Sequence, residues 1–60
     1  MARTADWLEA IREIVTPENV AAYHDTMDKW VFAHDKLDAY SIPSTEANID
    51  ALETLLEEAA

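Results

Sequence analysis

Carboxylates are the side chains in this sequence whose type and spacing could do chemistry. Glu46, Asp50, Glu53 and Glu57 follow one another at i, i+4, i+7 and i+11. In a helix this spacing places them in one stripe about 16 Å long, at about 1.5 Å per residue. One charge then falls every ~5–6 Å, the same order as the ~3.4 Å between phosphates along one DNA strand. The pattern predicts a row of carboxylates that replaces phosphates on the arginines and lysines of a partner.

The alternative interpretation of this stripe is a solvated helix face, which is common in proteins. Two features argue against it. Like charges at i, i+4 cost about 0.2–0.5 kcal/mol per pair, and no basic residue after Lys36 relieves them. Glu57 and Glu58 also lie at the expected end of the helix, where the helix dipole disfavours acids. General solubility, or adaptation to a salt-rich host, is the competing explanation.

A second acidic row is predicted from Asp25, Asp28 and Asp35, with Phe32 in its middle. On a continuous helix these residues share one face. An exposed aromatic among acids is typical of an interface anchor, because aromatic residues are enriched at binding hot spots. The alternative is that Phe32 packs beneath a neighbouring helix. Asp25 also precedes Lys29 by four residues, a stabilising pair, so this row is less purely anionic than the first.

Metal binding and catalysis have less support in the residues. His24 with Asp28 and His34 with Asp38 both place His and Asp at i, i+4, a helical spacing that can bind zinc. Ten residues separate the pairs, and at about 100° per residue they point about 80° apart, so one straight helix cannot bring both to one ion. A local His–Asp contact is the favoured interpretation. Cysteine and glycine are absent, so we expect no nucleophilic thiol, no phosphate-binding loop, no cofactor or metal, and no enzyme.

The elements that must position these residues are helices. The chain has no glycine, and its two prolines divide it into three segments with helical periodicity. Thr16-Pro17 is a helix start signal, and Pro43 disfavours helical geometry at the residue before it. The sequence therefore predicts helices over residues 5–15, 17–40 and 45–58. The expected fold class is all-α, a three-helix bundle of short, long and short helices in a single domain over residues 1–60.

The apolar spacing predicts how these helices pack. In the long helix, residues at intervals of three and four form a seam, namely Val20, Tyr23, Met27, Trp30, His34 and Leu37. Residues 30–33 are apolar on every side, which is typical of a central helix between two neighbours or of a dimer contact. The last helix has one apolar face, formed by Ile49, Leu52, Leu55 and Leu56.

Size and charge narrow the classes of function. A chain of 60 residues buries only about 60% of its unfolded surface, and small folds often gain stability by self-association, so a homodimer is an open alternative. Thirteen acids and four bases give a net charge of −9. This charge disfavours contact with nucleic acid or an anionic membrane and favours basic surfaces. The chain shows no secretory signal and no apolar run near ~20 residues, so we expect a cytoplasmic protein.

Two functions fit these observations. The first is a small inhibitor that binds and occludes a basic nucleic-acid-binding surface of a partner protein or complex, with the two acidic rows as contact residues. In size, charge and lack of catalytic residues, the sequence resembles the phage-encoded DNA mimics, among them anti-CRISPR and anti-restriction proteins. This resemblance is one of composition and involves no family motif. The alternative is a helical protein–protein interaction module, such as a docking or dimerisation domain, an antitoxin or an immunity-type protein, in which Trp30, Phe32 and Tyr40 supply the affinity.

Overall fold

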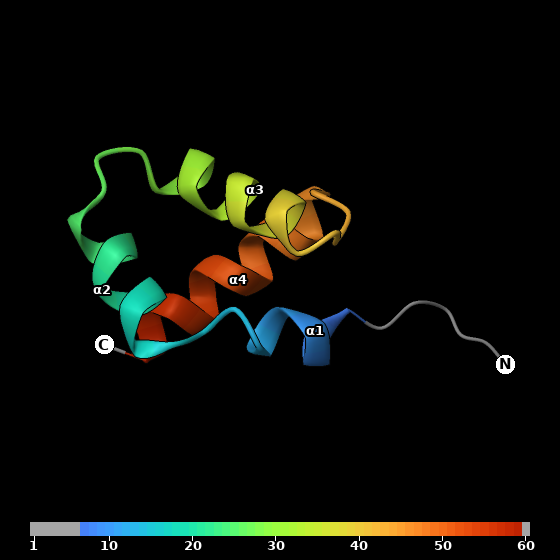
Figure 1. The fold of residues 1–60 in the computed structure, drawn as a ribbon. Helices are drawn as coiled ribbons and strands as arrows, with labels where there is room; N and C mark the ends of the chain where they lie inside the picture. The colour runs from blue at the N-terminus through green and yellow to red at the C-terminus, as the bar shows by residue number, and fades with distance from the viewer. Residues whose placement is uncertain (1–6, 60) are drawn as a thin grey trace, which may run out of the picture.

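The computed structural model describes residues 7–59, and these form four helices and no strand (Figure 1). The helices are α1 (Leu8–Arg12), α2 (Pro17–Asp25), α3 (Lys29–Ala39) and α4 (Glu46–Glu58). The all-α prediction is confirmed. The prediction of three helices in a short, long and short order is wrong, because the expected long helix is two helices. None of the helices in this part of the chain is long and apolar enough to cross a membrane.

The predicted helix over residues 17–40 breaks at residues 26–28 because the chain forms a cap on each side. Thr26 is extended and follows the last residue of α2. Asp28 is the N-cap of α3, and its Oδ1 accepts a hydrogen bond of 3.1 Å from the backbone N–H of Val31. An aspartate at this position satisfies an otherwise unpaired amide, which favours a new helix start. The break lets α2 and α3 take different directions against α4 (Figure 1).

The first helix is shorter than predicted. Residues 5 and 6, where the prediction began, lie outside the described residues. After Arg12 the chain tightens, with i to i−3 hydrogen bonds from Ile14 to Ile11 (3.0 Å) and from Val15 to Arg12 (3.0 Å). Thr16 then takes the predicted N-cap position, and its Oγ1 accepts from Asn19 N–H at 3.2 Å. The residue before a proline disfavours helical geometry, so α1 has to end before Thr16.

Helix α4 is the centre of the fold and contacts each of the other three helices (Figure 1). It begins at Glu46, one residue after the predicted start, with Thr45 as N-cap and its Oγ1 accepting from Asn48 N–H at 3.2 Å. Its apolar face carries Ile49, Leu52 and Leu56, all fully buried. These three side chains belong to one core of nine buried residues, completed by Ile11, Ile14, Tyr23, Ala33, Leu37 and Ile42.

The end of α3 is closed by a left-handed residue, Ser41, with φ of 60°. The N–H of Ser41 bonds to Asp38 O (3.0 Å), and the N–H of Ile42 bonds to Leu37 O (2.9 Å). This is the Schellman pattern, in which the residue after the left-handed position packs back on the helix. Ile42 and Leu37 are both buried. The motif normally uses glycine, which the chain lacks.

The predicted seam of the long helix is correct only at its ends. Tyr23 and Leu37 are buried, whereas Met27 is fully exposed and Trp30 is 51% exposed. The reason is the break at residues 26–28, which changes the direction of the second half of the segment. Tyr40 is 44% exposed, because it lies at the C-cap of α3 beyond the packed turns.

Candidate macromolecule-binding surfaces

The α4 acidic stripe comprises Glu46, Asp50, Glu53 and Glu57. All four residues lie within one uninterrupted helix, so at about 100° per residue they fall within an arc about 60° wide. Glu46, Asp50 and Glu57 are exposed, and Glu53 is half-buried. The structure thus brings these carboxylates onto one side of α4, next to the face that packs in the core.

No basic side chain among residues 7–59 forms an ion pair with this stripe. The ion pairs in this range join His34 Nδ1 to Asp35 and Asp38, each at 3.6 Å. The Lys29 ammonium donates to the carbonyl of Thr26 at 3.2 Å and lies 5.3 Å from the centre of the Tyr23 ring. The Lys36 ammonium lies 5.5 Å from the Phe32 ring. The lysines that could offset the stripe are therefore directed at a carbonyl and at aromatic rings.

One end of the stripe is fixed by a hydrogen bond from another helix. Tyr23 of α2 is buried, and its hydroxyl donates to Oε2 of Glu57 at 2.9 Å. Burial, the hydrogen bond to Glu57 and the charges of Glu57 and Glu53, in that order of size, together raise the pKa of Tyr23 to about 12. The phenol therefore stays a donor, and it holds the Glu57 carboxylate in one position.

The second acidic row does not form as predicted. Asp25 is the last residue of α2, Asp28 caps α3, and Asp35 lies on the exposed side of α3. Their shared face depended on a continuous helix, and the break at residues 26–28 removes it. The expected Asp25–Lys29 pair is also absent from the ion pairs of the described residues, since the two residues belong to different helices.

Phe32 packs at the edge of the core and is not a free-standing aromatic among acids. Its ring is 5.9 Å from the Tyr23 ring in an edge-to-face arrangement. It is half-buried and packs against the core cluster. The alternative interpretation of Phe32, packing beneath a neighbouring helix, describes its position, with Tyr23 of α2 as the neighbour.

The two histidines make separate local contacts. His34 contacts Asp38 through the i, i+4 spacing and also contacts Asp35, both at 3.6 Å. His24 Nε2 instead lies 3.3 Å from the carbonyl oxygen of Leu56, since the helix ends before Asp28. No group of three or more metal-ligating side chains that could hold an ion occurs in the described part of the chain.

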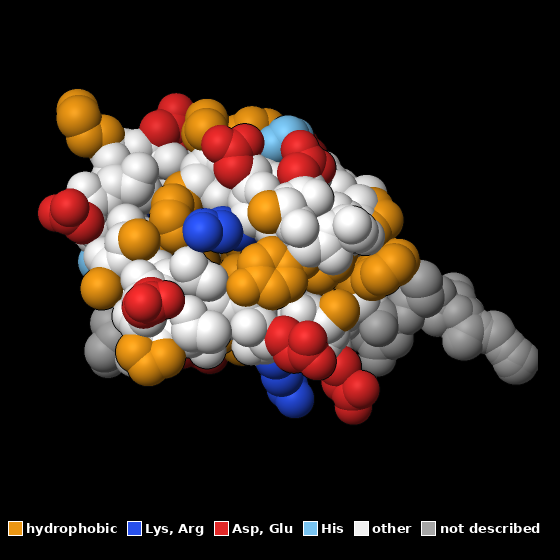
Figure 2. Space-filling view, in the orientation of Figure 1, with side chains coloured by type: hydrophobic (Ala, Val, Ile, Leu, Met, Phe, Trp, Pro, Cys, Tyr) orange, Lys and Arg blue, Asp and Glu red, His pale blue; other side chains and the backbone are white. Residues whose placement is uncertain are grey.

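A surface that the sequence indicated only at Trp30 lies on α3 and in the connection before it. We call Met27, Trp30 and Val31 the α3 apolar strip; all three are exposed. Figure 2 shows hydrophobic side chains along the edge where α3 lies, next to histidine and acidic side chains. Asp28 was the local sign of this strip. As the N-cap of α3 it interrupts the predicted long helix, so Met27 and Trp30 do not form one continuous packed seam.

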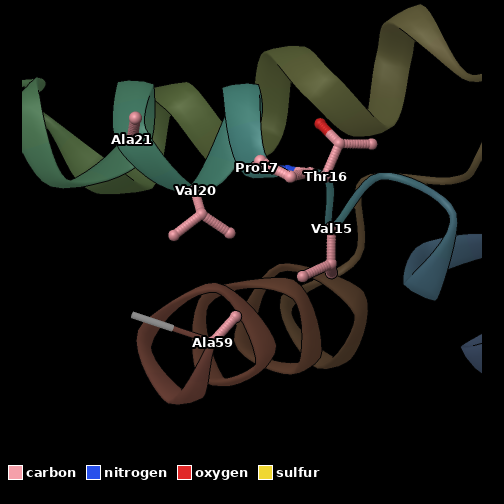
Figure 3. Close-up of a pocket in the computed structure, with 6 residues that line it drawn as sticks. All are labelled: Val15, Thr16, Pro17, Val20, Ala21 and Ala59. Atoms are coloured by element: carbon pink, nitrogen blue, oxygen red, sulfur yellow. The ribbon is translucent and has the colours of Figure 1, made fainter.

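A pocket of about 440 Å³ lies between the α1–α2 corner and the end of α4. Its lining comprises Val15, Thr16, Pro17, Val20, Ala21 and Ala59. Figure 3 shows Val15 and Val20 directed toward Ala59 across the space. The lining includes no titratable side chain, so these residues alone offer a ligand apolar contact and no acid–base chemistry.

No protein-family model and no curated protein matches the sequence, and no solved structure matches the fold. What the chain binds is therefore inferred from its own charges, exposed side chains and contacts. The α4 acidic stripe and the α3 apolar strip are the surfaces on which several neighbouring side chains could contact one macromolecule.

Proposed function

We propose that this protein is a small acidic inhibitor that binds and occludes a basic nucleic-acid-binding surface of a partner protein or complex. The observation that carries the proposal is the α4 acidic stripe, whose four carboxylates have no ion-pair partner among residues 7–59. A protein that needed only solubility would intersperse lysines along the helix, since like charges at i, i+4 repel.

The stripe has the properties that a phosphate substitute requires. Its charges repeat every ~5–6 Å on a rigid helix, so a groove that tracks a nucleic-acid backbone could contact several at once. The hydrogen bond from Tyr23 fixes Glu57 before binding, and a group that is already ordered loses less entropy on association. Binding through exposed charges weakens with salt, because they are screened within about 8–10 Å at physiological ionic strength.

A second candidate is a helical protein–protein interaction module of the docking, dimerisation, antitoxin or immunity type. The exposure of Trp30 and Tyr40 favours it, since large aromatics supply binding energy at interfaces. Phe32 is half-buried, so its substitution would disturb packing as well as binding. Trp30→Ala is therefore the more informative variant for this function. Binding by such a module should persist at high salt.

The experiment compares three baits in pull-downs from nuclease-treated host lysate, with captured proteins identified by mass spectrometry. The first bait is the wild type. The second carries Glu46→Gln, Asp50→Asn, Glu53→Gln and Glu57→Gln. The third, a matched control, neutralises four exposed acids away from the stripe, with glutamine at Glu9, Glu13, Glu18 and Glu58. Both variants lower the net charge from −9 to −5, so only the location of the lost charge differs.

The proposal predicts that the wild type and the control bait capture a nucleic-acid-binding protein that the stripe variant does not. Equal capture by all three baits would show that the stripe is a solvated face. Loss of capture by both variants would show that overall charge, and not the stripe, drives association. Glutamine at position 57 can still accept the Tyr23 hydrogen bond, so the stripe variant should keep its fold.

A further inference from the structure

The α3 apolar strip is exposed apolar surface on a small and highly charged chain. Met27 is fully exposed in the connection before α3, and Trp30 and Val31 lie on the first turn of that helix. Trp30 and His34 lie four residues apart on one face of α3, with Val31 three residues before His34, and Met27 directly precedes the N-cap Asp28. Burying a Trp, a Val and a Met on association would remove substantial apolar area from water.

The Trp30 indole is held in place by its neighbour. Its ring stacks on the His34 imidazole, with centroids 5.3 Å apart and planes 25° apart. His34 is in turn 3.6 Å from Asp35 and 3.6 Å from Asp38. This chain of contacts orders an exposed aromatic side chain, which reduces the entropy that binding would cost.

Acids border the strip. Asp28 adjoins Met27 in the sequence and caps α3, while Asp35 and Asp38 lie beyond His34, and all three are exposed. The described bases of α3 are turned elsewhere, since Lys29 bonds the Thr26 carbonyl and Lys36 lies over the Phe32 ring. The surface therefore has an apolar centre and an anionic border.

We propose that the α3 apolar strip docks a basic amphipathic segment of a partner protein, one that carries arginine or lysine beside aliphatic side chains. The aliphatic groups cover Met27 and Val31. A guanidinium of the segment lies against the Trp30 indole, a favourable cation–π arrangement, beside the His34 imidazole that Asp35 and Asp38 contact. The strip shares no residue with the α4 acidic stripe, so this inference does not depend on the proposed inhibitor; it shares Trp30 with the second candidate and names the class of segment that would bind there.

Electrostatics favours a basic segment over a second copy of the chain or an anionic membrane as the binding partner of the strip. A second copy of the chain would bring the same acidic border against itself, with a net charge of −9 on each copy, and like charges across an interface disfavour the contact. Three side chains are also far fewer than the roughly 20–30 residues a side of a stable dimer. An anionic membrane is repelled for the same electrostatic reason. A basic segment satisfies both the apolar centre and the border.

The test uses three synthetic helical peptides as probes. One combines leucine and arginine on an amphipathic pattern, one replaces arginine by glutamate, and one replaces leucine by serine. Each is titrated into the ¹⁵N-labelled full-length chain, and binding is followed by the indole N–H signal of Trp30 and the amide signals of α3. We expect the leucine–arginine peptide to bind, and each of the other two to bind at least tenfold more weakly, a difference of about 1.4 kcal/mol.

Variants locate the binding site. Two variants should each weaken binding of the leucine–arginine peptide at least tenfold. One is Trp30→Ala, and the other combines Met27→Ser with Val31→Ser. The Met27 side chain is fully exposed, so the second variant guards against a folding defect in the first. The variant neutralised along the α4 acidic stripe should still bind the peptide at the strip, with the Trp30 and α3 signals shifting as in the wild type.

Three results would overturn the inference. The first is peptide binding that shifts α4 signals and survives both strip variants. The second is equal binding of the glutamate peptide, which would leave the acidic border without a role. The third is a dimer in sedimentation equilibrium that Trp30→Ala converts to monomer, which would make a second copy the occupant.

Discussion

The hydroxyl of Tyr23 donates a hydrogen bond of 2.9 Å to Oε2 of Glu57, thirty-four residues later in the chain. This contact joins α2 to α4 and ties the core to the α4 acidic stripe, because Tyr23 is buried while Glu57 is exposed. A buried phenol satisfies its donor on a surface carboxylate, and that carboxylate gains a fixed position. One side-chain pair therefore links the stability of the fold to the geometry of the proposed binding surface.

Removal of the Tyr23 hydroxyl should destabilise the protein. We expect Tyr23→Phe to lower the free energy of unfolding by about 1 kcal/mol, the usual net value of a hydrogen bond, because the ring stays packed. Glu57→Gln should cost less, since the amide oxygen can still accept. Urea denaturation of Tyr23→Phe, of Glu57→Ala, which removes the acceptor, and of the double variant gives the coupling energy. Independent, additive effects in this cycle would contradict a direct contact.

Stability should fall at alkaline pH as Tyr23 titrates. The pKa of Tyr23 is about 12 in the folded chain and about 10 when unfolded, because burial and the Glu57 contact disfavour the phenolate. A pKa raised by folding means that its contribution is fully present below about pH 10 and is lost as pH rises from there through about 12. Urea denaturation across this pH range should show a steeper fall in the free energy of unfolding for the wild type than for Tyr23→Phe. The same pH dependence of the free energy of unfolding in both proteins would contradict the raised pKa of Tyr23.

Ser41→Gly should stabilise the fold. Ser41 has a φ of 60°, a left-handed conformation that costs an L-residue roughly 1–2 kcal/mol and glycine almost nothing. Part of this gain is lost to the greater freedom of glycine in the unfolded chain, so we expect an increase of about 0.5–1 kcal/mol. Thermal unfolding followed by circular dichroism measures it. Ala39→Gly, two residues earlier within α3, is the control and should destabilise.

Asp28→Ala should destabilise the start of α3. Its Oδ1 accepts the Val31 amide, and loss of an N-cap side chain typically costs about 1 kcal/mol. Asp28→Ser should retain most of the stability because serine caps as well. Chemical denaturation and far-ultraviolet circular dichroism of both variants test this. An alanine variant with more helix and higher stability would mean that residues 17–40 prefer one continuous helix.

The sequence predicts those elements of the fold that depend on local signals. Thr16-Pro17 starts α2 where the sequence indicated, α4 begins within one residue of its predicted start, and the chain leaves α3 before Pro43. Ile49 and Leu52 are buried, as their spacing on one face predicted. Each of these outcomes depends on side chains within about one helical turn, where propensity and capping dominate.

The break at residues 26–28 and the partner of Glu57 were missed for different reasons. Apolar residues continue at helical spacing from Tyr23 to Leu37, so periodicity alone favoured a single helix. The capping signal of Asp28 was present and was outweighed by that pattern. The Tyr23–Glu57 bond gives no local signal, because its two residues are brought together only when α2 packs on α4.

The α4 acidic stripe was predictable because it depends only on the geometry of a single helix. Four carboxylates at i, i+4, i+7 and i+11 share a face in any uninterrupted helix, and α4 is uninterrupted from Glu46 to Glu58. The row of Asp25, Asp28 and Asp35 failed because it crossed the break. A pattern of charges along the sequence therefore predicts a shared surface only where one continuous helix carries all of the residues.

Competition with nucleic acid for the captured partner shows whether the α4 acidic stripe occludes a nucleic-acid-binding surface. The partner is bound to its own fluorescein-labelled nucleic acid, and the chain is titrated in while fluorescence anisotropy reports release. We expect full release by the wild type and by the control neutralised at Glu9, Glu13, Glu18 and Glu58. We expect at least tenfold weaker competition by the stripe variant, equivalent to about 1.4 kcal/mol or more. A chain that binds the partner without releasing its nucleic acid, or a stripe variant that competes as well as wild type, would contradict the claim.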